Sequence, residues 1–260
     1  MQKQIVFLTC LCLLALMTGC STVYNPATGR QEHIFIDSAQ EVQIGRSMDR
    51  QVIATQYQPW NDPVEQRRLN VLGQKLVRVS DRQDIVYRFQ ILDSPDYNAF
   101  ALPGGYVYIF KGLYEKLDEP ELAAVLAHEI SHVAAKHSVK RLQSALGYNL
   151  LLGLVFVGLG NDDPQITRQI GAVSDTVFDL LSRGYSREDE LFSDRLAVKY
   201  LLAAGYDPEA LVRALEFLDK EKGPGGRVFE ILSTHPRMAE RVRKVKEEIR
   251  MSEKQLTIKN

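Results

Sequence analysis

The spacing of apolar residues along the chain predicts a mostly helical protein with one short region of β-strands. Apolar residues recur at mixed intervals of three and four over 38–56 and 63–79, which indicates two amphipathic helices. Residues 85–92 carry alternating apolar side chains, and 106–110 are β-branched or aromatic, so both ranges are typical of strands. From residue 118 onward the helical spacing returns, and we expect helices at 118–137, 139–159, 164–181, 187–204, 208–222 and 236–251.

These elements predict a single α+β domain, mostly helical, in which a small β-sheet lies next to a central helix. We assign the domain to residues 38–251, with an N-terminal linker at 20–37 and a C-terminal tail at 252–260. Nearly half of the 260 residues are apolar, so a chain of this length can bury a proper core. No internal repeat and no low-complexity linker divides the sequence.

Charge and cysteine content exclude several classes of protein. The 32 lysine and arginine residues nearly balance the 33 aspartate and glutamate residues, and no basic stripe with interleaved aromatic residues is present. We therefore expect no binding to nucleic acid. Cys10, Cys12 and Cys20 are the only cysteines, so the domain has no disulfide framework, no cysteine nucleophile and no cysteine-ligated metal.

Residues 1–19 have the features of a secretory signal peptide. Lys3 supplies a positive start, residues 5–17 form an apolar stretch, and small residues precede Cys20. An uncleaved membrane anchor is the alternative, but about 13 apolar residues fall short of the ~20 needed to span a bilayer. The end of the segment resembles a bacterial lipobox, which implies that Cys20 is lipidated and becomes the mature N-terminus. Ser21 rather than aspartate follows it, which in such lipoproteins implies sorting to the outer membrane.

A second strongly apolar stretch covers residues 146–160, with Asn149 as its only polar interruption. The stretch fits a buried helix of the domain. It also fits a helix that contacts the membrane or an unfolded client protein, and both interpretations stay open at this point.

Residues 128–132 read His-Glu-Ile-Ser-His, which is a zinc-binding pattern. On an α-helix, this spacing places His128 and His132 about 40° apart on one face and one turn from each other, so both can reach one ion. Glu129 lies beside that face, in the position that a general base toward water requires. The apolar residues around the motif form a stripe on the opposite side of the helix, which we expect to face the core: Leu122, Leu126, Ile130 and Val133.

A catalytic zinc ion needs a third protein ligand, and two residues compete for that place. His137 falls about 180° from the first histidine if the helix continues, so we interpret it as a charge near the helix C-terminus. Glu190 is the better candidate, because Ser186 and Asp189 form a capping-box pattern that opens a helix just before it. Asp194 lies one turn further on the same face, where it can accept the second ring N–H of a ligating histidine.

These motifs together resemble one known family, the gluzincin metallopeptidases that include the CAAX prenyl protease and the bacterial heat-shock membrane protease HtpX. The resemblance extends from about residue 41 to residue 243. Four signatures carry it in order: residues 98–108, residues 121–137, Ser186-Arg187 with Glu190 and Asp194, and residues 234–236. The sequence departs from the family at Ser193, where alanine is usual, and this exchange of one small residue for another leaves the ligand assignment intact.

The resemblance implies a zincin-like catalytic domain with one zinc ion, and it supports the ligands and the base assigned above: His128, His132, Glu190 and Glu129. The transmembrane spans of the integral members are missing here, which implies the soluble periplasmic lipoprotein branch. We therefore expect a zinc-dependent endopeptidase on the periplasmic face of the outer membrane, anchored through lipidated Cys20. Its expected partners are misfolded envelope or outer-membrane proteins and the outer-membrane assembly machinery. The alternative is a zinc-containing chaperone that binds unfolded outer-membrane clients with little or no proteolysis.

The resemblance also implies roles for residues outside the metal motif. Asn98, Ala99 and Phe100 lead into a strand at the edge of the active-site cleft, where an extended peptide substrate can bind by β-augmentation. A turn and strand needed only for folding is the alternative. His235, a second catalytic candidate, is expected near the zinc ion, either as an inhibitory fourth ligand or as a group that stabilises the developing oxyanion. A loop histidine before a helix is the alternative.

Overall fold

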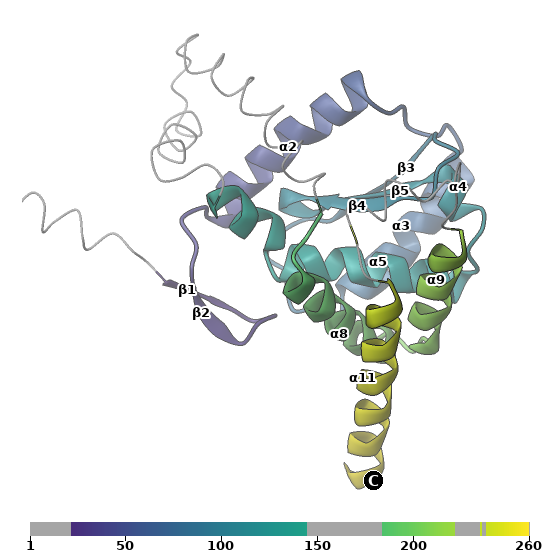
Figure 1. Cartoon of the computed structure of the whole chain (residues 1–260). Helices are drawn as coiled ribbons and strands as arrows, with labels where there is room; N and C mark the ends of the chain where they lie inside the picture. Colours follow the sequence, from purple (N-terminus) through teal and green to yellow (C-terminus); the bar gives the residue numbers. More distant parts are fainter. Residues whose placement is uncertain (1–21, 145–183, 222–234, 236–237, 260) are drawn as a thin grey trace, which may run out of the picture.

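The computed structural model of the chain describes residues 22–144, 184–221, 235 and 238–259 (Figure 1). Its strands are β1 (Thr22–Asn25), β2 (Arg30–His33), β3 (Arg88–Leu92), β4 (Ala99–Leu102) and β5 (Tyr106–Phe110). Its helices are α2 (Ser38–Thr55), α3 (Pro63–Val77), α4 (Lys111–Tyr114), α5 (Glu119–Ala134), α8 (Arg187–Ala203), α9 (Glu209–Lys220) and α11 (Met238–Lys259), with the short turn η1 (Pro103–Gly105) before β5. Residues 137–144 are also helical. Among these described helices, none is both long enough and apolar enough to cross a membrane.

The predicted fold class is confirmed. Helices dominate the described residues, and a three-stranded sheet lies beside α5, the helix that carries the metal-binding motif (Figure 1). The predicted bounds of α2, α3, α8 and α9 agree closely with the structure, because each helix has clear capping or terminating residues. Two further expectations, the signal peptide with Cys20 and the apolar stretch at 146–160, lie outside the described residues.

Several element bounds differ from the prediction. The strand expected at 85–92 begins only at Arg88, and α11 continues to Lys259 through residues expected to form a tail. Part of the expected linker forms the hairpin β1–β2. Its turn is closed by Asn25, whose side chain accepts from the Ala27 amide at 3.0 Å, and by Gly29, which takes a left-handed φ of 66°.

The sheet has the order β3-β5-β4, with β5 parallel to β3 and antiparallel to β4. Because successive side chains of a strand point to opposite faces, β5 contributes to two cores. Tyr106, Tyr108 and Phe110 pack with α2, whereas Val107 and Ile109 pack with α3 and α5. This double burial explains why β5 is apolar without alternation. The sheet therefore fixes α5 on one side and α2 on the other (Figure 1).

α5 is the central helix of the fold, and every residue from Leu122 to Ala134 is buried. A capping box starts it: the Asp118 side chain accepts from the Glu121 amide, and the Glu121 side chain accepts from the Asp118 amide. The sheet and α3 cover one side of α5, and α8 and α9 cover the other. The metal-binding motif is thus carried by the most enclosed helix in the described part of the chain.

A buried ion pair ties α2 to the end of α5. Arg82 Nη1 and Nη2 lie 3.0 Å and 2.7 Å from the two carboxylate oxygens of Glu41, and the two side chains are only 4% and 1% exposed. Arg82 Nη1 also donates to the Val133 carbonyl at 2.9 Å, and Glu41 Oε1 accepts from the Gly104 amide at 2.9 Å. These four contacts join α2, the loop after α3, η1 and the last turn of α5.

Replacing Arg82 with methionine removes both close charged contacts of the buried Glu41 carboxylate and leaves Lys136 at 4.0 Å as its nearest cation, so we expect the free energy of unfolding to fall by about 3–5 kcal/mol. Urea unfolding followed by circular dichroism measures the change. Replacing both Glu41 and Arg82 with methionine should recover much of the loss, because the fully buried Glu41 carboxylate is then gone as well. Arg68→Ala, which breaks an exposed pair with Glu119, is the control and should cost less than about 1 kcal/mol. Equal losses for Arg82→Met and Arg68→Ala would contradict a structural role for the buried pair.

Candidate metal centre

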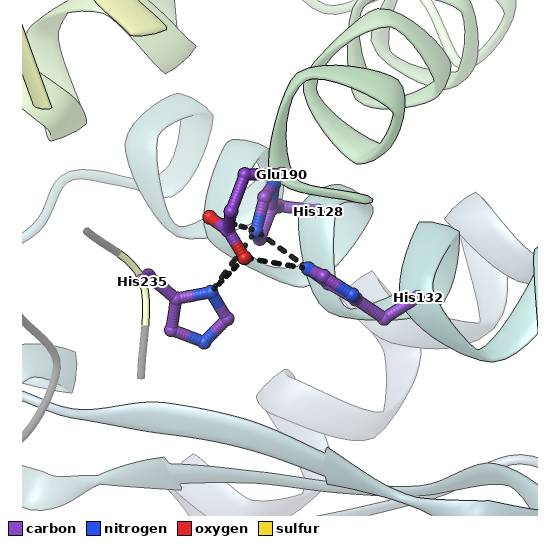
Figure 2. Close-up of side chains that lie close together, drawn as sticks. All are labelled: His128, His132, Glu190 and His235. Atoms are coloured by element: carbon purple, nitrogen blue, oxygen red, sulfur yellow. Dashed lines mark hydrogen bonds and ion pairs between the residues drawn. The ribbon is translucent and has the colours of Figure 1, made fainter. Parts of the chain in front are cut away.

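α5 and α8 pack side by side and bring the predicted ligands together (Figures 1 and 2). His128 and His132 lie one turn apart on α5, and Glu190 lies in the first turn of α8. His235 reaches the same point from the segment before α11 (Figure 2). One ligand atom from each of these four buried side chains lies within 4.8 Å of the others. The fold therefore assembles a cluster from three separate parts of the sequence.

The ring nitrogens and carboxylate oxygens of the cluster converge on one point. His128 Nε2 lies 3.0 Å from His132 Nε2. Glu190 Oε1 lies 3.3 Å from His132 Nε2, and Glu190 Oε2 lies 3.6 Å from His128 Nε2. Burial lowers the pKa of both histidines below the ordinary value. Both imidazoles are therefore neutral near pH 7, which is the form that binds a metal ion.

The cluster fits a bound zinc ion. Burial alone would raise the pKa of Glu190, but His235 and Arg241 hold it well below its ordinary value, so Glu190 is ionised. Two imidazole nitrogens and one carboxylate oxygen form a set that zinc accepts in catalytic sites. Beside this set, Glu129 Oε2 is buried and has no hydrogen-bond partner among the described residues. An unpaired buried oxygen is costly, so water or a ligand at the cluster would satisfy it.

Glu129 faces the cluster rather than the apolar core. Its Oε1 lies 3.5 Å from His235 Nε2, and its side chain is buried. Burial raises the pKa of Glu129, against the opposing effect of the nearby His235 and His132. A carboxylate whose pKa is shifted toward neutrality can both accept and return a proton. The position and the pKa of Glu129 therefore suit a general base.

Asp194 contacts the outer nitrogen of His128, as its spacing from Glu190 predicts. Asp194 Oδ1 lies 3.0 Å from His128 Nδ1, the kind of contact that orients a metal-binding histidine through its second nitrogen. Arg241 of α11 donates to both oxygens of Asp194, at 2.7 Å and 2.8 Å, and its Nη1 lies 2.8 Å from Glu190 Oε2. Burial alone would raise the pKa of Asp194, but Arg241 lowers it to about 2.

Arg241 is a residue that the sequence interpretation missed, although a signal was present. Met238, Val245 and Ile249 are buried apolar positions on one face of α11, and Arg241 falls on the same face. The Arg241 side chain is only 3% exposed. A charged residue in an apolar stripe indicates a buried partner of opposite charge, and here the partners are the two carboxylates of α8.

His235 lies inside the cluster and not in an exposed loop. Its Nδ1 lies 2.9 Å from Glu190 Oε1, and its side chain is 3% exposed. Burial alone would lower its pKa, but Glu190 and Glu129 raise it above the ordinary value. The residue therefore lies between two carboxylates, Glu190 of α8 (Figure 2) and Glu129 of α5.

The interpretation of His137 as a charge at the end of the helix is wrong. α5 ends at Ala134, and Lys136 takes a φ of 57°, a left-handed conformation that turns the chain just before His137. His137 is therefore buried beside His132, with the two Nδ1 atoms 3.0 Å apart. Burial holds the pKa of His137 well below its ordinary value, so it is neutral and contributes no charge to the helix dipole.

The expected substrate-binding residues lie at the start of β4, which is an edge strand of the described sheet. The side chains of Asn98 and Ala99 are buried, and the Phe100 ring stacks on Tyr108 with ring centroids 4.8 Å apart. The Asn98 and Ala99 side chains are therefore enclosed, and the Phe100 side chain is partly buried. Any contact between this segment and a peptide would be made chiefly by the main chain of the edge.

The comparison with known proteins agrees with this centre. The model of peptidase family M48 matches residues 63–249, which is more than half of the chain and includes the whole cluster. The chain belongs to peptidase family M48.

Among curated proteins, this M48 chain is 30% identical over 182 residues to the beta-barrel assembly-enhancing protease of Escherichia coli K12, covering 68% of the chain and 37% of that protein. It is 30% identical over 175 residues to the mitochondrial metalloendopeptidase OMA1 of Schizosaccharomyces pombe, covering 66% of the chain and 50% of that protein. It is 27% identical over 181 residues to the metalloprotease LoiP of E. coli K12, covering 70% of the chain and 69% of that protein. The M48 chain thus spans half or less of the length of the first two relatives.

If Asp194 orients His128, Asp194→Asn will weaken zinc binding roughly 10- to 100-fold, because the neutral amide is a poorer acceptor and leaves Arg241 with one carboxylate fewer. Competition with a chromogenic chelator measures the affinity. Glu188→Gln, on the same helix but with a side chain that is 78% exposed, should leave the affinity unchanged. An Asp194→Asn protein that binds zinc as tightly as the unaltered chain would rule out this role.

Proposed function

We propose that this chain is a zinc-dependent endopeptidase of the bacterial envelope, with His128, His132 and Glu190 as its zinc ligands. One observation carries the proposal: in a member of peptidase family M48, these three side chains meet in a buried cluster with Glu129 beside them. When bound, zinc supplies a Lewis acid that acidifies water and polarises the carbonyl of a peptide bond. The protein residues around it position the reactants and move the proton.

Glu129 is the proposed base. It accepts a proton from the attacking water as the new carbon–oxygen bond forms, and it gives that proton to the leaving amine as the carbon–nitrogen bond breaks. Support comes from the unpartnered Glu129 Oε2, which is buried beside the ligands and available to a water molecule. The raised pKa of Glu129 makes both proton transfers easier near neutral pH.

His235 is the second proposed catalytic residue. Its Nε2 is buried, and among the described residues it has no hydrogen-bond partner, although Glu129 lies nearby. A protonated imidazole at this point can donate to the oxygen of the scissile carbonyl as negative charge develops on it. The same position would let the neutral imidazole occupy the open side of the cluster, so His235 can also restrain the site.

The proposed substrates are unfolded or misfolded proteins, because the edge of β4 suits an extended chain. An extended peptide can add to a sheet edge through main-chain hydrogen bonds, which do not depend on its sequence. We assign this contact to the segment Asn98, Ala99 and Phe100, acting through the main-chain groups that face away from β5, since the Asn98 carbonyl already accepts from the Phe110 amide at 2.9 Å. A folded protein has few unpaired strands of this kind to offer.

The proposed location is the periplasmic face of the outer membrane, with lipidated Cys20 as the anchor. The lipobox-like residues before Cys20 support the anchor. The relative in E. coli that is named for enhancing β-barrel assembly supports a role in quality control of outer-membrane proteins, with the assembly machinery as a partner.

Replacing Glu129 with glutamine should lower the cleavage rate roughly 10²- to 10⁴-fold and leave bound zinc unchanged, because the amide cannot take up a proton. Cleavage of casein, followed by gel electrophoresis, and metal analysis of the purified protein measure the two effects. Glu119→Gln, at an exposed position of the same helix, is the matched control and should cleave normally. A Glu129→Gln protein that cleaves casein at the full rate would contradict the assignment of Glu129 as the base.

Removing the metal should abolish cleavage, because the ligand set has no other source of a Lewis acid. We expect 1,10-phenanthroline to stop cleavage of an unfolded porin, and added zinc to restore it. Fragment formation and porin binding are measured in the same samples. Porin binding without fragments in the zinc-loaded protein would contradict the peptidase and favour the chaperone.

A further inference from the structure

The two histidines of α5 have different partners on their outer sides. His128 Nδ1 faces the carboxylate of Asp194 at 3.0 Å, whereas His132 Nδ1 faces the imidazole of His137 at the same distance. On its inner side, His132 Nε2 lies 3.0 Å from His128 Nε2 and 3.3 Å from Glu190 Oε1. One nitrogen of His132 therefore points into the cluster, and the other points at His137.

The role of His132 Nε2 determines which nitrogen of that ring carries the proton. An imidazole that offers its Nε2 lone pair to a metal must carry its proton on Nδ1. His132 is fully buried, so that proton needs an acceptor within the protein, and His137 Nδ1 provides one. His137 must then carry its own proton on Nε2, which lies 3.4 Å from Asp189 Oδ1. The Ser193 hydroxyl is a more distant neighbour of His137 Nδ1, at 3.3 Å.

A second contact fixes the plane of the His132 ring. The Tyr185 ring stacks on it with the centroids 3.8 Å apart and an angle of 26° between the planes. The Tyr185 hydroxyl lies 2.8 Å from the hydroxyl oxygen of Ser138, the residue that follows His137. The same short segment, 137–138, thus contacts His132 directly and also holds the ring that covers it.

We propose that His137 is a positioning residue that accepts the Nδ1–H of His132 and thereby holds the His132 Nε2 lone pair toward the zinc site. The inference rests on the proposed function, because it concerns how the chain holds zinc. A neutral acceptor suits this position, because Glu190, which lies 3.3 Å from His132 Nε2, already supplies negative charge on the inner side of the ring. His137 orients the ligand without adding a further charge.

The decisive experiment compares substitutions of His137 in the purified full-length chain. His137→Phe keeps a ring of similar shape but has no acceptor, so we expect zinc affinity, measured by chelator competition, to fall roughly 10- to 100-fold. His137→Asn places an amide oxygen at the position of Nδ1, so it should restore the affinity to within a few-fold. The visible absorption of the cobalt-loaded proteins should change in the Phe variant and return in the Asn variant. His33→Phe, at an exposed histidine of β2, is the control for loss of a histidine.

Two outcomes would overturn the inference: a His137→Phe protein that binds zinc like the unaltered chain, or an Asn variant as weak as the Phe variant. If the Phe variant does not fold, His137→Gln replaces it, because its amide reaches past the position of Nδ1. The Gln variant should then bind at least about 10-fold more weakly than the Asn variant, and equal affinities would contradict the role. Failure of the unaltered chain to bind zinc would instead contradict the proposed function, so the two failures are distinguishable.

Discussion

Buried negative charge is the constraint on which the described part of this fold depends. Glu129, Glu190 and Asp194 lie within one cluster between α5 and α8, and an ionised carboxylate in the interior costs several kcal/mol unless it is paired. Arg241 pairs with both carboxylates of α8, and it comes from α11. α8 can therefore lie against α5 at this depth because α11 is docked beside it. Charge compensation, as well as apolar packing, sets the positions of the three helices.

The elements that the sequence predicted well are those in which a regular local geometry relates one residue to the next. The turn of a helix relates His128 to His132 and Glu190 to Asp194, so four-residue spacing was enough to place each pair on one face. The central strand β5 was recognisable because its residues are β-branched or aromatic. In such cases the partner of a residue lies within one or two turns, and no knowledge of the fold is required.

Contacts between segments far apart in the sequence could not be predicted from local geometry. Arg241 meets Asp194 across 47 positions and Arg82 meets Glu41 across 41, and no periodic pattern relates such residues. The prediction for His137 was wrong for a different reason. Its predicted direction assumed that α5 continues, but Lys136 ends the helical path without the glycine or asparagine that usually marks a left-handed turn. Because of one unusual backbone angle, the residue that we had interpreted as a charge near the helix C-terminus is a buried neighbour of a proposed ligand.

The turn at Lys136 also connects the cluster to α2, a helix that contributes none of the proposed zinc ligands. Lys136 Nζ lies 4.0 Å from Glu41 Oε2, and Arg82 holds the Val133 carbonyl just before the turn. The left-handed angle is thus supported by the ion pair between α2 and the loop after α3. A rotation about that one backbone bond would displace His137 and break its contact with His132 Nδ1, at 3.0 Å. α2 supplies no atom to the cluster, but through Glu41 it contacts the turn that positions His137.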